Sequence, residues 1–164
     1  MFSLLIKKNF PHVVIINDVH GSHEDLAEIS ETLTDPGDIK DVISGLKELH
    51  SVDITVCDFK VCRGWEGQVK ITNPVSFGYL DFPPVNTRYN FPEPSYVKFK
   101  SDIWCLGCFL FGKNIPKRFL KSQELLDSFI KDTPDYIKGM LKINPEDREL
   151  PPNESEDSKG CTVQ

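Results

Sequence analysis

Two cysteines three positions apart have the spacing of a reactive or metal-binding pair. Cys105 and Cys108 form a Cys-x-x-Cys pattern, which occurs in redox motifs and in zinc sites. A zinc site needs two further ligands at suitable spacing, and none is evident in the sequence. The run from Ile103 to Phe111 is strongly apolar. We therefore expect both thiols to lie in the protein core.

One aspartate stands at the start of the same apolar run. Asp102 directly precedes Ile103, so a helix that buries this run also buries a carboxylate. A buried carboxylate without partners is costly. We therefore expect Asp102 to accept hydrogen bonds from backbone donors.

A motif near the amino terminus raises metal chemistry of another kind. Asn17-Asp-Val-His-Gly21 follows an apolar strand and resembles the first motif of calcineurin-like metallophosphatases, in which Asp and His ligate one metal. A two-metal site needs further ligands on later strands. After His23 the only histidine is His50. The scarcity of histidine ligands after His23 disfavours a metallophosphatase. We interpret the histidines as loop or helix-end residues.

The last four residues resemble a lipidation signal. Cys161-Thr-Val-Gln164 matches a prenylation box with an aliphatic third position and a farnesyl-type final residue. The preceding Glu154-Ser-Glu-Asp157 is acidic and no second cysteine lies nearby. One lipid without a basic patch gives marginal, reversible membrane binding. Cys161 is thus a candidate lipidation site, with a chance match as the alternative.

The composition indicates one globular domain. The chain has 164 residues, of which 39% are hydrophobic and 27% charged, so a sizeable core can form. A net charge of -6 argues against a nucleic-acid partner, because phosphate contacts require a clustered positive field. Five cysteines are an odd number, and Met1–Ile6 is too short for a signal peptide. We expect a reducing, cytoplasmic compartment.

Periodicity predicts the elements that would position these residues. The strongest signal is the apolar stripe after Thr34-Asp35-Pro36, a typical helix start. The residues from Gly64 to Gly67 predict a turn. Residues 81–95 carry four prolines and cannot form a helix or a central strand. Helices are expected at Glu24–Thr32, Asp35–His50, Ser101–Phe111, Ser122–Lys131 and Pro134–Lys142, and strands at His12–Ile16, Asp53–Cys57 and Gln68–Thr72.

Six segments, in order, resemble the carboxyl-terminal lobe of eukaryotic protein kinases. They are Ile43–Ser51 (the helix before the catalytic loop), Ile54–Lys60 (the loop), Val69–Thr72 (the strand before Asp-Phe-Gly), Asn86–Glu93 (the end of the activation segment), Ser101–Gly107 (a buried helix) and Ile143–Arg148 (a late motif). The most specific are Asp-x-Trp-x-x-Gly within Ser101–Gly107 and Asn-Pro-Glu-Asp-Arg within Ile143–Arg148.

The resemblance implies a fold and three structural roles. The fold is mainly α (α+β), a protein-kinase-like C-lobe over residues 13–148, helical with a few short strands and without the amino-terminal lobe. Residues 1–12 form an amino-terminal segment and residues 149–164 a flexible acidic tail. In the family, the counterpart of Asp102 ties down the catalytic loop. The counterparts of Glu93 and Arg148 form a buried bidentate salt bridge; the alternative is two unrelated exposed charges.

The groups required for phosphoryl transfer are incomplete. That reaction needs a phosphate-covering loop, a strand lysine, metal ligands and a base. The resemblance places the base at Asp58 and a phosphate-contacting lysine at Lys60. The metal-ligand positions fall on Arg63 and Asn73, a cation and a neutral amide. The residues before Val13 contain no glycine-rich pattern. We interpret Asp58 and Lys60 as vestigial.

Three hypotheses follow. The first is a catalytically inactive, truncated kinase-like protein without cofactor or metal that binds or inhibits a partner protein kinase, as the resemblance to viral kinase fragments implies. It would be cytoplasmic, or weakly membrane-associated through a farnesyl group. The second is a Ser/Thr protein kinase that uses ATP, magnesium, Asp58 and Lys60 with an atypical or donated nucleotide lobe. The third is a gene remnant. The resemblance also implies that the final helices of the kinase lobe are missing or shortened after Arg148, which should leave apolar surface exposed to a partner.

Overall fold

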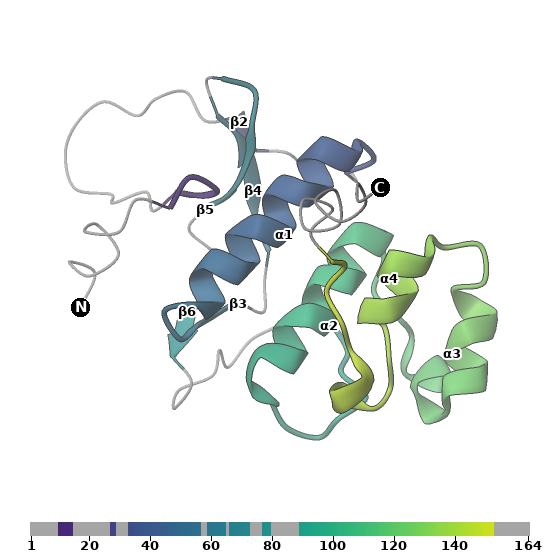
Figure 1. Ribbon diagram of the computed structural model, residues 1–164. Coiled ribbons are helices and arrows are strands. Elements are labelled where there is room, and N and C mark those ends of the chain that lie inside the picture. The colour runs from purple at the N-terminus through teal and green to yellow at the C-terminus, as the bar shows by residue number, and fades with distance from the viewer. Residues whose placement is uncertain are drawn as a thin grey trace, which may run out of the picture.

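Two long helices organise an α+β fold (Figure 1). The computed structural model describes residues 10–14, 27–28, 33–56, 59–64, 66–72, 77–79 and 89–152. Helix α1 (Pro36–His50) packs against the strands of the amino-terminal half. Helix α2 (Lys98–Phe111) packs against the carboxyl-terminal helices and also contacts the strand that follows α1. The predicted mixture of helices and short strands is confirmed.

Helix α1 forms where the sequence predicts it. The Asp35 side chain accepts hydrogen bonds from the backbone of Gly37 (2.8 Å) and Asp38 (3.2 Å), and Pro36 occupies the first turn. These contacts satisfy amide groups that have no partner within the helix. Its buried apolar stripe comprises Ile39, Val42, Ile43, Leu46 and Leu49.

The strands form two small sheets. The first has the order β1 (Val13–Val14), β5 (Val69–Thr72), β4 (Val61–Arg63) and β2 (Ala27–Glu28). Its β1–β5 pair is parallel, and the other pairs are antiparallel. The second sheet pairs β3 (Ile54–Val56) with β6 (Phe77–Tyr79), also antiparallel. α1 covers β5 of the first sheet and β3 of the second.

A tight turn connects β4 to β5, as the sequence predicts. The Gly64 amide donates to the carbonyl of Gln68 at 2.8 Å, and the Gly67 amide donates to the carbonyl of Gly64 at 2.9 Å. Gly67 has φ +87°, a left-handed conformation that favours glycine. The turn sets the antiparallel register in which Arg63 lies opposite Val69.

The helix predicted over Glu24–Thr32 is wrong. Ala27–Glu28 form strand β2, in which Ala27 lies opposite Arg63 and Glu28 opposite Cys62. The predicted helix spans only about two turns, too short to be stable in isolation. The backbone pairing of β2 with the edge of β4 therefore outweighs the local preference of these residues for a helix.

The remaining helices occur near their predicted positions with different ends. α2 begins three residues before Ser101, whereas α3 (Gln123–Phe129) and α4 (Asp135–Met140) are shorter than predicted. Two 3-10 helices, η2 (Lys117–Lys121) and η3 (Pro145–Asp147), were not predicted. A β-carbon at Gly107 would lie 2.8 Å from a methyl carbon of Leu141, so glycine permits the close approach of α2 to the end of α4.

Candidate functional site

The Asp102 carboxylate joins three parts of the fold. Its side chain is fully buried on α2. One oxygen, Oδ2, accepts hydrogen bonds from the Val56 amide and from His50 Nε2, both at 2.9 Å. The other, Oδ1, accepts the Tyr96 hydroxyl at 2.9 Å. Asp102 thus has the predicted backbone donor and, in addition, two side-chain donors from the end of α1 and the loop before α2.

The histidine in this network is held from two sides. His50 must carry its proton on Nε2 to donate to the carboxylate. Its ring also stacks on Phe99 of α2, with 4.1 Å between ring centroids. Only 13% of the His50 side chain is exposed. Sequence reasoning treated His50 as a helix-end residue and missed this contact, because the partner lies 52 positions away in the chain.

Two residues near the predicted base in the sequence, Val56 and Phe59, contact α2. Val56, before it, donates to Asp102. Phe59, after it, is buried and its ring centroid lies 6.0 Å from that of Phe109 on α2. The backbone carbonyl of Lys60 accepts the Thr72 amide of β5 at 3.0 Å. These contacts position Val56, Phe59 and Lys60 against α2 and β5.

Three of the predicted site residues lie outside the described residues. They are Asp58, the predicted base, Asn73, a predicted metal-ligand position, and Cys161, the candidate lipidation site. The Asn17–Gly21 motif of the phosphatase alternative also lies outside them. Lys60 is described; it is half-buried and lies directly before β4.

Arg63, a predicted metal-ligand position, lies on a strand. It is the last residue of β4, and the chain enters that strand directly after Lys60. Its Nη1 and Nη2 donate to the two carboxylate oxygens of Asp38 on α1 at 3.0 and 2.6 Å, and Nη1 also donates to the Gly67 carbonyl at 2.7 Å. The bond to Asp38 raises the pKa of Arg63. Arg63 therefore joins the β4–β5 turn to α1.

Glu93 and Arg148 form the bidentate ion pair that the resemblance implies. Nη1 donates to Oε1 at 2.8 Å and Nη2 to Oε2 at 2.5 Å. The Arg148 side chain is fully buried, and only 7% of the Glu93 side chain is exposed. Burial by itself raises the pKa of Glu93, but the hydrogen bonds and positive charge of Arg148 hold that pKa below its ordinary value.

The remaining donors of Arg148 are also used. Nε donates to the Lys142 carbonyl at 2.8 Å, and Nη1 to the Lys100 carbonyl at 3.0 Å. The guanidinium lies over the Trp104 ring, 4.9 Å from the ring centroid. Arg148 thus connects the loop before η3 to α2 and to Glu93, which makes it a structural centre of the carboxyl-terminal half.

The Cys-x-x-Cys pair lies in the core, as predicted. Cys105 and Cys108 are both fully buried free thiols on α2. Burial raises the pKa of Cys108 well above its ordinary value, which disfavours the reactive thiolate. Across the described ranges no group of three or more His, Cys, Asp or Glu residues could hold a metal ion.

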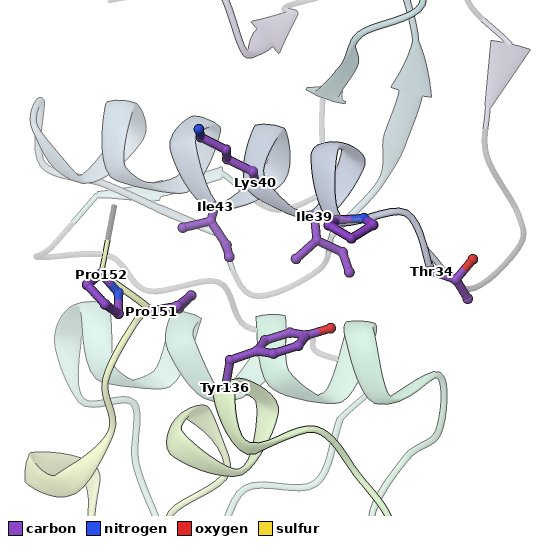
Figure 2. A pocket seen from close by; sticks show the side chains of 8 residues that line it. Thr34, Ile39, Lys40, Ile43, Tyr136, Pro151 and Pro152 are labelled. Atoms are coloured by element: carbon purple, nitrogen blue, oxygen red, sulfur yellow. The ribbon is translucent and has the colours of Figure 1, made fainter. Parts of the chain in front are cut away.

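A pocket lies between α1, α4 and the segment after η3. Figure 2 shows Ile39 and Ile43 pointing from α1 toward the ring of Tyr136 on α4, with Pro151 and Pro152 at one end. Its volume is about 510 Å³, within the range of small-molecule pockets. The lining also contains Thr34, Pro36 and Lys40. The sequence analysis did not predict this pocket, since its walls come from three separate segments.

The chain was compared with protein-family models and with curated proteins. No protein-family model matches the chain, and no curated protein matches it. Within the described part of the chain, no helix is both long and apolar enough to cross a membrane. Any functional assignment therefore depends on the residues and contacts of this chain.

Proposed function

We propose that this chain is a catalytically inactive, protein-kinase-like carboxyl-terminal lobe that acts by binding a partner protein kinase and inhibiting it. The observation that carries the proposal is the pairing of residues from separate kinase-like motifs. Glu93 contacts Arg148 across 55 positions, and Asp102 contacts Val56 across 46. Both contacts are those expected from the resemblance.

The contacts of Arg63 favour a binding role over catalysis. Phosphoryl transfer depends on electrostatic stabilisation by metal ions and their ligands. Arg63 is a cation paired with Asp38, and β4 begins directly after Lys60, so the segment after Lys60 forms a strand. The other predicted ligand position, Asn73, carries a neutral amide instead of a carboxylate. These features support the loss of the metal site while the structural residues persist.

A nucleotide-binding experiment tests the inactive character. Purified chain is heated with and without magnesium and ATP, together with the variants Asp58→Asn and Lys60→Ala. We expect the melting temperature of the wild-type chain to be the same with and without nucleotide. A rise that both variants abolish would instead support a Ser/Thr kinase with a donated nucleotide lobe. A chain without a cooperative melt would support the remnant hypothesis.

A capture experiment tests the binding role. Tagged chain is expressed in cells, cross-linked and recovered, and each enriched protein kinase is purified. We expect at least one kinase to bind the purified chain directly and to phosphorylate its substrate more slowly as the chain is titrated. Absence of any directly binding kinase, or unchanged kinase rates at saturation, would overturn the proposal.

A further inference from the structure

One end of the molecule carries a basic surface, defined here as Lys113, Lys117, Arg118, Lys121 and Leu125. Residues 113–121 contain four cations and no carboxylate, although the whole chain has a net charge of -6. All four cationic residues are exposed. Among the described residues none of the four takes part in a salt bridge. No salt bridge among the described residues therefore neutralises these four cations.

Aromatic rings support two of these cations. Phe119 stacks on Phe129 with 4.3 Å between centroids, and Phe111 meets Phe129 edge-on at 5.7 Å. The Arg118 guanidinium lies 4.8 Å from the centroid of Phe119, and Lys113 Nζ lies 6.0 Å from that of Phe111. Cations above aromatic faces are attracted by the ring electrons. The rings therefore restrain the two charged side chains at the surface before any partner binds.

An apolar contact point lies beside these charges. Leu125 on α3 is 43% exposed and is the one exposed large hydrophobic side chain in the described ranges. α3 packs against η2, which carries Lys117, Arg118 and Lys121. Figure 1 shows α3 at the edge of the molecule, separated from α1 by α2 and α4. The basic surface thus combines an exposed leucine with unpaired cations, a composition suited to a protein interface.

We propose that the basic surface binds an acidic segment of a partner protein that has an apolar side chain next to its carboxylates. The proposal deepens the binding role above and depends on it for the identity of the partner. Glu124 and Asp127, on either side of Leu125 on α3, are exposed carboxylates that repel any anion placed beside them, and a nucleic acid carries a continuous run of phosphates. A protein segment can place its apolar group against Leu125, uncharged groups beside these two carboxylates, and its own carboxylates against the cations of η2.

A peptide-binding experiment tests this surface on the full chain. The probe is a fluorescent peptide in which glutamates surround one leucine, and binding is followed by anisotropy. Reversal of two exposed charges in Lys117→Glu/Arg118→Glu should weaken binding by about tenfold. The matched control, Lys40→Glu/Lys98→Glu, makes the same change in net charge at exposed residues elsewhere and should bind as the wild type does.

Two further measurements define the chemistry. Leu125→Ser should weaken binding of the leucine-containing peptide. It should leave binding of an all-glutamate peptide unchanged. Circular dichroism melts verify that each variant is folded. The proposal would be overturned if Lys117→Glu/Arg118→Glu and Lys40→Glu/Lys98→Glu weakened peptide binding equally. It would also be overturned if neither double variant weakened peptide binding. A labelled single-stranded oligonucleotide that binds as tightly as the peptide would also overturn it, in favour of a nucleic-acid partner.

The two proposals fail in distinguishable ways. If the wild-type chain binds the acidic peptide through this surface but no kinase binds directly, the proposed function fails and the basic surface stands. If a kinase binds the wild-type chain and Lys117→Glu/Arg118→Glu equally well, the function stands and the basic surface is not its docking site.

Discussion

Replacing Glu93 with glutamine gives the sharpest test of the structural reasoning. The substitution keeps the size of the side chain but removes the anion that faces the fully buried guanidinium of Arg148. The bonds from Arg148 to the Lys142 and Lys100 carbonyls do not involve Glu93 and should persist. The variant therefore leaves the buried guanidinium without its counter-ion, and it also replaces one carboxylate oxygen, an acceptor from Arg148 or Ser101, by an amide donor.

The expected loss is large for a chain of this size. Removing one partner of a buried ion pair costs about 3 to 5 kcal/mol, because the remaining charge stays desolvated. Domains of this class have a total free energy of unfolding of about 5 to 15 kcal/mol. Replacing both residues by methionine should cost less than the sum of the two single replacements, since neither charge is then left unpaired.

Urea unfolding followed by circular dichroism measures these differences. The control is Lys138→Ala, which breaks an ion pair with Asp135, a residue whose side chain is 99% exposed. Such pairs contribute about 0.2 to 1 kcal/mol, so the control should change the free energy of unfolding little. A loss below about 1 kcal/mol in Glu93→Gln would refute the inference that this pair is a buried, essential contact.

The same pair predicts a pH dependence. Arg148 lowers the pKa of Glu93 in the folded state, so the folded chain binds that proton less readily than the unfolded chain does. The resulting stability is complete at neutral pH. It is lost as the pH falls from the ordinary glutamate pKa of about 4.3 through the lower folded-state pKa. Between neutral pH and the acid limit, the wild-type chain should therefore lose more stability than Glu93→Gln.

Three other predictions concern separate contacts. Gly45→Ala should lower the free energy of unfolding, measured in urea, by about 1 to 2 kcal/mol, because the new β-carbon would lie 2.6 Å from the backbone oxygen of His12. In the control Gly139→Ala the nearest atom, the backbone oxygen of Glu149, lies 3.9 Å from the new β-carbon, so the substitution should be neutral or stabilising. Asp102→Asn should cost about 2 kcal/mol and speed hydrogen exchange of the Val56 amide, and unchanged exchange would contradict the network. Arg63→Ala should cost less than about 1 kcal/mol, because its side chain is 45% exposed; a larger loss would contradict a surface role.

Several features were predictable because their signals are local. The start of α1 follows from Asp35 and Pro36, whose cap contacts lie within three residues. The β4–β5 turn follows from its glycines, one of which has a positive φ. The burial of Asp102 follows from the apolar run beside it. In each case the residues that determine the outcome are neighbours in the chain.

Other features depend on partners that the local pattern does not contain. Ala27–Glu28 form a strand because β4 offers an edge, although the surrounding residues have helical spacing. Arg63 lies on β4 and binds Asp38 of α1, which is 25 positions away in the chain. Its position in the kinase-like motif did not predict this contact. The pocket beside Tyr136 requires α1, α4 and the residues after η3 to meet.

The sequence by itself determined the start and the apolar stripe of α1, the β4–β5 turn and the core position of the thiols, and the kinase resemblance implied the pairing of Glu93 with Arg148. That pairing was accessible through motif resemblance because a buried ion pair needs both partners. The tertiary structure alone decided that His50 and Tyr96 belong to the Asp102 network and that, among the described residues, the four cations of the basic surface take part in no salt bridge. The physical reason is that hydrogen bonding and charge neutralisation depend on distances in space, which residue types and spacing along the chain do not fix.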